Sequence, residues 1–197
     1  MLDRTIPFYN TILRGDQLLT QNICLPDGYA FASYRDEFAF AWAKLEFAAG
    51  DFDTLAEAQR YFEHNYLSDK AALMRRGVFV TDSCGAVVGS CLAWTDLRGE
   101  EPVSSLHWLI VSPEHQGRGI GRAVTEETLR RFDKLPIYIH TQPWSWKAIL
   151  LYLSLGFRLQ KSDTFSHYHN EYAQAMETLR AVVSPEQYRM MEAMSDD

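Results

Sequence analysis

The clearest periodic pattern in the chain runs from Arg35 to Ala49, where apolar residues recur at helical spacing. The apolar positions i, i+4, i+7 and i+11 of this segment are Phe38, Trp42, Leu45 and Ala49. They lie on one face of a helix, and Gly50-Asp51 predicts its end. Thr54 and Glu57 have the spacing of a capping box, which predicts a second helix from there through about Leu67.

Short apolar segments bounded by turn residues predict the first strands. Val78–Thr81 and Val87–Trp94 flank Ser83-Cys84-Gly85-Ala86, an arrangement typical of a β-hairpin. Residues 4–34 are expected to hold two or three short extended pieces, with a turn at Pro26-Asp27-Gly28.

From residue 106 onward, predicted strands and helices alternate. The expected order is a strand at 106–111, a helix at 121–132, a strand at 136–141, a helix at 145–155 and a strand at 157–160. Strands joined by whole helices imply a local βαβ crossover, and hence an α/β fold. Beyond Glu171, apolar and charged residues alternate, and Ser184-Pro185-Glu186 predicts the start of a last helix. We expect this tail to pack on the sheet or on a partner subunit.

Composition limits the classes of partner. A chain of 197 residues with 47% hydrophobic residues can bury one substantial core, so we expect a single domain over residues 1–197. The formal net charge is −7 and no basic run is present, which argues against a nucleic-acid partner. The longest apolar stretches fall far short of the roughly 20 residues of a membrane helix, so we expect no membrane partner.

The cysteines and the N-terminus indicate a compartment. The N-terminal residues lack the basic-then-apolar order of a signal peptide. The three cysteines, Cys24, Cys84 and Cys91, are odd in number and lack the spacing of metal ligands. We therefore expect reduced thiols, a cytoplasmic location and no metal.

The segment from Leu106 to Val124 carries the most informative motif. An apolar strand is followed by a turn at Ser112-Pro113, a loop with glycines at alternate positions, and a helix. Gly117, Gly119 and Gly121 have no Cβ, so their backbone N–H groups can surround an anion at the helix N-terminus. Arg118 and Arg122 add positive charge, and the pattern predicts a pyrophosphate-binding cradle. The alternative is a tight strand-to-helix corner without a ligand.

A second, distant segment separates these alternatives. Gln116-Gly-Arg-Gly-Ile-Gly121, together with Ala148-Ile-Leu-Leu-Tyr152 and Leu155-Gly-Phe157, resembles the GCN5-related N-acetyltransferase (GNAT) superfamily in spacing and order over about residues 78–160. The resemblance implies a central mixed, largely antiparallel sheet flanked by helices. It places the acetyltransferase core at about residues 28–165 and a C-terminal helical extension at about residues 170–195.

The resemblance also implies acetyl-CoA as the acetyl donor, CoA as a product and no metal. The implied cofactor-binding residues are Leu109, Ile110, Val111, Gln116, Gly117, Arg118, Gly119, Ile120, Gly121, Arg122, Ser145 and Tyr152. The family often has Asn where this chain has Ser145, which puts that contact in doubt. Pro143 either marks the strand leaving its neighbour to admit the cofactor, or begins an ordinary turn.

Two residues are expected to carry the proton transfers. Tyr152 aligns with the family tyrosine that protonates the departing thiolate, and the alternative for Tyr152 is core packing. Some relatives have a glutamate that acts as the general base at the position of Ser105. A serine hydroxyl cannot take this role. His107 lies two residues on and on the same strand face, so we predict it as the general base, with a structural histidine as the alternative. His140 is the second choice.

The expected acceptor is an amine on a small molecule or a peptide, and the sequence does not identify it further. Glu37, Trp42 and His140 are the candidate acceptor-binding residues. The predicted reaction is direct attack of the amine on acetyl-CoA in a ternary complex. The alternatives are an acyl-CoA-binding sensor without turnover and an acyltransferase that uses a different acyl group. A homodimer is left open.

Overall fold

The computed structural model describes residues 3–18 and 23–197. These residues group into two compact units. The first unit contains residues 23–93 and 107–131, and the second contains residues 3–18, 94–106 and 132–197. Strands β4 (Val87–Arg98) and β5 (Glu101–Val111) have residues in both units.

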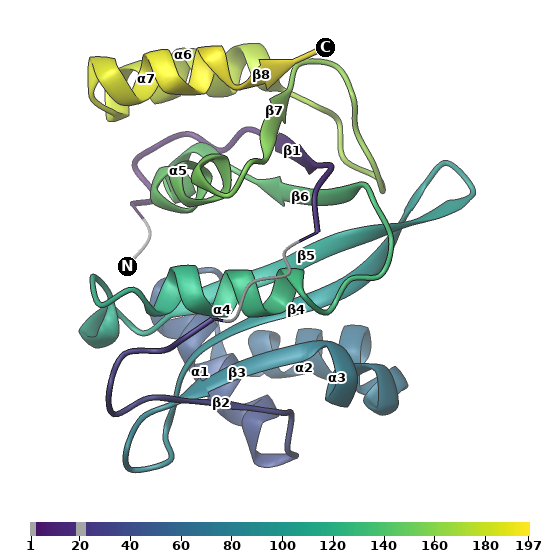
Figure 1. Cartoon of the computed structure of the whole chain (residues 1–197), viewed down its shortest axis with the longest axis vertical. Helices are drawn as coiled ribbons and strands as arrows, with labels where there is room; N and C mark the ends of the chain where they lie inside the picture. Colours follow the sequence, from purple (N-terminus) through teal and green to yellow (C-terminus); the bar gives the residue numbers. More distant parts are fainter. Residues whose placement is uncertain (1–2, 19–22) are drawn as a thin grey trace. The chain divides into compact units, whose positions relative to one another are not determined.

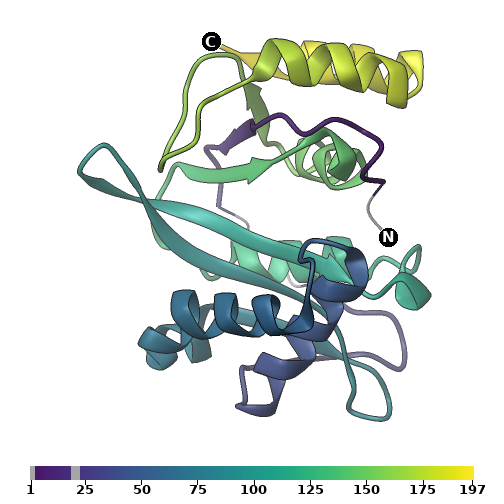
Figure 2. The ribbon, with the colours of Figure 1, turned by 180° about the vertical axis from the view of Figure 1, so that it is seen from behind.

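The first unit carries the strand order β2-β3-β4-β5. Its own strands are β2 (Ala30–Ala32) and β3 (Gly77–Thr81). Its helices are α1 (Glu37–Ala49), α2 (Leu55–Tyr66), α3 (Lys70–Arg76) and α4 (Ile120–Leu129). Short 3-10 turns lie at Leu67–Asp69 (η1) and Pro113–His115 (η2). Helices α1 and α2 pack against each other (Figure 2).

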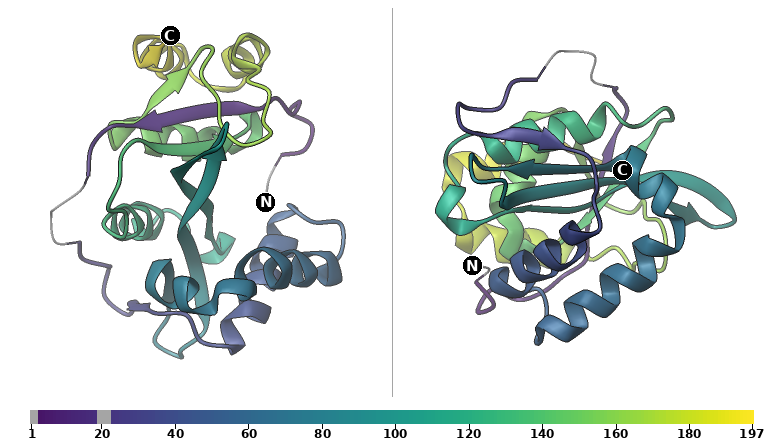
Figure 3. Two further views of the ribbon diagram at one scale, coloured as in Figure 1. Left: turned by 90° about the vertical axis from the view of Figure 1, so that its right-hand side faces the viewer. Right: turned by 90° about the horizontal axis from the view of Figure 1, so that it is seen from below.

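The second unit carries the strand order β4-β5-β6-β1-β7-β8. Its own strands are β1 (Thr11–Gly15), β6 (Ile137–Thr141), β7 (Arg158–Gln160) and β8 (Ser195–Asp196). Its helices are α5 (Trp146–Ser154), α6 (Tyr172–Val182) and α7 (Pro185–Ala193), and a 3-10 turn (η3) lies at Pro143–Ser145. Helix α6 contacts both β1 and α7 (Figures 1 and 3). The predicted tail therefore packs within its own unit.

The strand pairing confirms the predicted fold class, which is mixed and largely antiparallel. The pairs β1·β6, β1·β7, β2·β3 and β3·β4 are antiparallel, whereas β5·β6 and β7·β8 are parallel. The parallel pair joins Ser104 to Ile137 and Ser105 to Tyr138. Helix α4 lies between β5 and β6 in the chain, so this is the expected crossover. Among the described residues, no helix has both the length and the apolar character needed to cross a membrane.

Three helix boundaries lie where short sequence motifs predict them. Thr54 accepts a hydrogen bond from the Glu57 backbone at 3.2 Å, and the Glu57 carboxylate accepts one from Thr54 N at 3.0 Å, which confirms the capping box. Gly50 adopts a left-handed conformation with φ 98° and ends α1, as predicted. Helix α7 begins after Ser184 at the predicted start.

Some elements were missed. Helix α3 has only seven residues, too few for a periodic pattern to be distinct. Helix α6 lies within the C-terminal helical extension that the family resemblance implies, and it buries Ala175, Met176 and Leu179. Of the extended pieces expected in residues 4–34, β1 and β2 are present and the turn at Pro26 is confirmed, while residues 19–22 lie outside the described residues.

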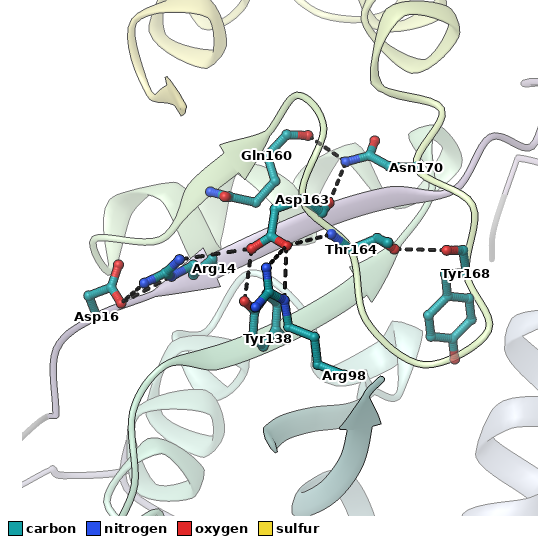
Figure 4. A network of polar contacts seen from close by, with 9 residues as sticks. All are labelled: Arg14, Asp16, Arg98, Tyr138, Gln160, Asp163, Thr164, Tyr168 and Asn170. Carbon is teal, nitrogen blue, oxygen red and sulfur yellow. Dashed lines mark hydrogen bonds and ion pairs between the residues drawn. The ribbon is translucent and has the colours of Figure 1, made fainter. Parts of the chain in front are cut away.

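In the second unit, Asp163 is a hub of polar contacts (Figure 4). Arg98 donates to its Oδ1 through Nε at 3.1 Å and Nη2 at 2.7 Å. Tyr138 donates its hydroxyl to Oδ2 at 2.8 Å, and Arg14 lies 3.8 Å from the same oxygen. Asp163 thus joins the loop after β7 to residues of β1, β4 and β6.

The contacts at the Asp163 hub shift the pKa values of Asp163 and Tyr138. Burial acts to raise the pKa of Asp163, but hydrogen bonds from Arg98, Tyr138 and the Thr164 backbone outweigh it, so this pKa lies below its ordinary value. Burial and the hydrogen bond to Asp163 raise the pKa of Tyr138. The carboxylate form is therefore the one that the fold stabilises.

We predict that Asp163→Asn lowers the free energy of unfolding by about 1–3 kcal/mol near neutral pH, because several charge-assisted hydrogen bonds are lost. A lowered folded-state pKa contributes stability that is present above the ordinary value of 3.8 and lost as the pH falls through the folded pKa. The difference between variant and wild type should therefore shrink in acid. Urea unfolding of the variant and the wild type, near neutral pH and in acid, measures this difference in the free energy of unfolding. Asp16→Asn, at an aspartate 60% exposed, is the control. An equal cost for both variants would contradict the role of the hub.

In the first unit, Glu46 is a buried carboxyl on α1. Its side chain is 1% exposed, and burial followed by the charge and hydrogen bond of Asp51 raises its pKa well above the ordinary value. Burial also raises the pKa of the Cys91 thiol to about 12. Burial therefore disfavours the charged forms of both Glu46 and Cys91.

We predict that Glu46→Gln stabilises the protein near neutral pH and not in acid. A carboxyl whose folded-state pKa is raised contributes stability below its ordinary value of 4.5, and that contribution is lost as the pH rises through the folded pKa. Glutamine has nearly the shape of a protonated glutamate and does not ionise, so the variant does not lose this stability as the pH rises. Thermal unfolding between acid and neutral pH measures the difference in stability between variant and wild type. Glu37→Gln, at the exposed start of α1, is the control. Equal pH dependence in Glu46→Gln and wild type would refute it.

Candidate functional site

The glycine-rich loop lies in the first unit, between the end of β5 and the start of α4. Ser112 N donates to Val88 O at 2.8 Å, and Gln116 Nε2 donates to Val111 O at 2.9 Å, so both ends of the turn are tied to the strands. Gly117 and Gly119 have φ of 75° and 85°. Only glycine adopts this left-handed conformation readily, and it lets the chain turn sharply into the helix.

The space around these glycines is open. A Cβ placed on Gly117 or Gly119 would meet no heavy atom within 4 Å. Helix α4 has no side-chain cap on its N-terminus, and its first turn closes with Ala123 N donating to Gly119 O at 3.1 Å. The N–H groups of Ile120, Gly121 and Arg122 precede that bond. A helix N-terminus of this kind attracts anions, and the glycines leave its backbone N–H groups uncovered.

The two arginines of the motif have different partners. Arg122 pairs with Glu126 one helical turn later at 3.2 Å. Arg118 donates to Tyr29 Oη at 3.0 Å and to Glu114 O at 3.2 Å. Tyr29 Oη also lies 2.8 Å from His115 Nδ1. The loop is therefore fastened by side chains to the segment before β2.

The strand leading into the loop holds the three residues expected to offer main chain to the cofactor. Ile110 is buried, whereas Leu109 and Val111 are half-buried. A Cβ on Gly89 of β4 would lie 3.1 Å from Ile110 O, so glycine allows the two strands to approach closely there.

A backbone irregularity precedes these residues. Trp108 has φ of 52°, which is unusual for a bulky residue. Successive strand residues normally point to opposite faces, yet His107 and Trp108 both contact the helical layer of α1 and α2. His107 Nδ1 lies 2.8 Å from Tyr66 Oη on α2, and the Trp108 ring lies 5.4 Å from that of Trp42 on α1. The left-handed residue thus brings two adjacent side chains to one face.

His107, the predicted base, is half-buried and its partner Tyr66 is only 1% exposed. The phenol hydroxyl can donate to Nδ1 or accept from it, depending on the imidazole tautomer. In either case Tyr66 fixes the orientation of the ring from its Nδ1 side.

The aromatic side chains around Trp42, a candidate acceptor-binding residue, form a packed cluster. Its rings, with centroids 5.1 to 6.3 Å apart, are those of Trp42, Phe52, Tyr61 and Trp108. Trp42 has no exposed surface, so an acceptor would meet the half-buried Phe52 or Trp108 that cover it. Glu37 is exposed at the start of α1, 3.7 Å from Arg35.

Tyr152 and Ser145 belong to the second unit. Tyr152 lies on α5 and is 4% exposed, with its ring 6.1 Å from that of Phe157. Ser145 accepts a hydrogen bond from Gln142 Nε2 at 3.0 Å, and its side chain makes no cap on α5. Pro143 begins the turn η3, which matches the ordinary-turn alternative.

His140, also in the second unit, lies on β6. Its Nε2 is 2.8 Å from Asn10 Oδ1, and its ring stacks on Tyr168 at 3.6 Å and 11°. Asn10 donates to Glu171 Oε2 through both N and Nδ2, at 2.8 and 2.9 Å. Because Nδ2 must donate to the carboxylate, Oδ1 accepts from His140 Nε2.

Sequence reasoning missed Tyr29, Tyr66, Asn10 and Glu171. Tyr29 contacts Arg118, Tyr66 contacts His107 across 41 positions, and Asn10 contacts His140 across 130 positions. Glu171 in turn holds Asn10. No local pattern marks such partners.

Comparison with known proteins agrees with this geometry. The family model described as an acetyltransferase (GNAT) domain matches residues 75–159. A mycothiol acetyltransferase of Acidothermus cellulolyticus is 34% identical over 104 residues, which are 44% of this chain and 31% of that protein. The GCN5-related N-acetyltransferase of Sphaerobacter thermophilus aligns with a TM-score of 0.56 and 18% identity, over 77% of this chain and 48% of that one. A tandem GNAT protein from the clavulanic acid biosynthesis pathway aligns with a TM-score of 0.54 and 17% identity, over 77% of this chain and 50% of that one.

The chain therefore spans about a third of the mycothiol acetyltransferase and about half of each of these structures. The matched segment 75–159 contains the glycine loop, α4 and Tyr152. Residues 75–159 of the chain match the acetyltransferase (GNAT) domain family, and the fold is the one found in solved members of the GCN5-related N-acetyltransferase superfamily.

Proposed function

We propose that this protein transfers an acetyl group from acetyl-CoA to an amine by direct attack in a ternary complex. The observation that carries the proposal is the open glycine loop at Gly117 and Gly119, at the uncapped N-terminus of α4. Backbone N–H groups at such a terminus suit the diphosphate of a CoA thioester. The GNAT domain match over residues 75–159 supports the same assignment.

The loop residues Gln116 to Arg122 would hold the diphosphate, and the main chain of Leu109 to Val111 would hold the arm that carries the thioester. Bound acetyl-CoA supplies an electrophilic carbonyl and a thiolate leaving group. We propose that Ser145, although its hydroxyl accepts from Gln142, contacts the cofactor as the corresponding family residue does.

In this proposal His107 accepts the proton of the amine. Because Tyr66 holds Nδ1, we assign the amine proton to Nε2. The positive charge that develops on the imidazole is then stabilised by Nδ1–H donating to the buried Tyr66 oxygen. Imidazole, with an ordinary pKa near 6.5, suits this role at neutral pH.

Tyr152 is proposed to give its proton to the departing sulfur. Its hydroxyl is a phenol with an ordinary pKa of about 10, close to the basicity of a thiolate. Support comes from the Ala148–Tyr152 pattern and from the position of Tyr152 on α5.

The proposed acceptor is an amine on a small molecule or peptide, contacted by Glu37, His140 and the rings over Trp42. All three cysteines are free, in line with a cytoplasmic enzyme. A regulatory module that binds acyl-CoA without turnover is distinguished by ligand-induced thermal stabilisation without consumption of acetyl-CoA over a broad amine panel. A panel of acyl-CoA donors tests for a different acyl group.

Gly119→Val should weaken acetyl-CoA binding at least roughly tenfold, because the side chain fills the space between the backbone amides and the phosphates. Calorimetry on the folded variant measures the affinity. Gly85→Val is a matched control, since Gly85 has φ of 81° and open surroundings in the β3–β4 turn. Wild-type affinity in folded Gly119→Val would remove the cradle from the proposal.

Tyr152→Phe should retain acetyl-CoA affinity and lower kcat roughly 10- to 1,000-fold, because the thiolate loses its proton donor. Steady-state kinetics under conditions where chemistry limits the rate, with calorimetry for binding, separate the two effects. An unchanged kcat would assign Tyr152 to core packing.

His107→Ala should lower kcat/KM and abolish an acidic limb with an apparent pKa of about 6–7, while acetyl-CoA affinity stays close to wild type. The pH profile of kcat/KM measures this, with His140→Ala as the comparison. If the limb persists in His107→Ala and disappears in His140→Ala, His140 is the base and the assignment to His107 is wrong.

A further inference from the structure

Two side chains of the glycine-rich loop meet a single hydroxyl from outside the matched family segment. Arg118 Nη1 lies 3.0 Å from Tyr29 Oη, and His115 Nδ1 lies 2.8 Å from the same atom. The Tyr29 and His115 rings are nearly perpendicular, at 87° with centroids 5.7 Å apart. Tyr29 precedes β2 and is anchored by its N–H, which donates to Pro26 O at 3.3 Å.

A guanidinium has donors only, so the Tyr29 oxygen accepts from Arg118. The direction of the second bond depends on the imidazole tautomer, because the Tyr29 hydroxyl can donate to His115 Nδ1 or accept from it. When the hydroxyl donates, neutral His115 carries its proton on Nε2, and the cluster offers this N–H and the remaining guanidinium donors to an outside group. We assign this tautomer to the ligand-bound protein.

The charge of this cluster is not compensated locally. Across residues 3–18 and 23–197, the structure pairs neither Arg118 nor His115 with a carboxylate. The arginines of α4 differ in this respect, because Arg122 pairs with Glu126, and both Arg130 and Arg131 pair with Glu127. A cation held by neutral oxygens beside an anion-binding loop is suited to an anionic ligand.

We propose that Tyr29, His115 and Arg118 form a phosphate-binding subsite beside the glycine cradle. Arg118 and His115 contact a phosphoryl group of the CoA cofactor, and Tyr29 is the positioning residue that holds both. The inference rests on the proposed function, since it requires a CoA ligand. The phosphoryl group belongs either to the diphosphate or to the 3′-phosphate of the ribose, and the chemistry of recognition is the same for both.

Tyr29 matters because Arg118 is exposed and long. Without the hydroxyl, the guanidinium keeps only the Glu114 carbonyl at 3.2 Å and regains side-chain freedom that binding must then remove. Removing one oxygen atom from Tyr29 should therefore weaken binding even though Tyr29 itself does not contact the ligand.

The test is calorimetric titration of the full chain with CoA and with dephospho-CoA, which lacks the 3′-phosphate. Tyr29→Phe should weaken CoA binding roughly 3- to 20-fold, and His115→Gln and Arg118→Ala should each weaken it by at least as much. In the Arg118→Ala, His115→Gln background, Tyr29→Phe should have no further effect, because its partners are gone. Losses seen with both ligands identify the diphosphate, and losses seen with CoA alone identify the 3′-phosphate.

The matched control is Tyr188→Phe, which removes a hydroxyl that accepts from Arg180 at 3.2 Å between α6 and α7. It should leave both affinities unchanged. Wild-type affinity of Tyr29→Phe for CoA and dephospho-CoA alike would overturn the inference while leaving the cradle intact. If wild-type protein binds neither ligand, the proposed function itself is wrong.

Discussion

A phosphate group can be bound by backbone amides only where no Cβ covers them, and this constraint shapes the loop between β5 and α4. Gly117 and Gly119 satisfy it through left-handed backbone angles that leave open space where a side chain would stand. The same angles turn the chain from an extended strand into a helix within a few residues. The uncapped first turn of α4 then adds the positive end of the helix dipole. The cradle is thus a property of the main chain.

The side chains around the loop hold this main chain in place. Gln116 fastens the turn to the end of β5 through Val111 O, and Tyr29 fastens Arg118 and His115 from the segment before β2. Just upstream, the left-handed Trp108 turns His107 toward Tyr66. The first unit therefore presents an open glycine loop just after β5 and an oriented imidazole on β5 itself.

The sequence was most informative where the physics is local. The capping box at Thr54, the left-handed Gly50 and the glycine loop each depend on residues a few positions apart, and each is found as predicted. It was least informative where a residue's role depends on a distant partner. His107 was selected by its position on a strand, but nothing near it in sequence indicated Tyr66 on α2. The Asp163 hub could not be predicted for the same reason, because its partners lie on three separate strands. Trp42 was expected at an acceptor site because it is aromatic, yet it is fully buried beneath Trp108.

The central claim is that the backbone between Gln116 and Arg122 binds the phosphates of a CoA thioester. Its most direct test is the amide nitrogen–proton NMR spectrum of uniformly labelled wild-type protein titrated with CoA. The account predicts that the amides of Gly117, Gly119, Ile120 and Gly121 shift together, with one dissociation constant, and that the hairpin amide of Gly85 does not follow them. Saturable binding with shifts elsewhere and unmoved loop amides would contradict it.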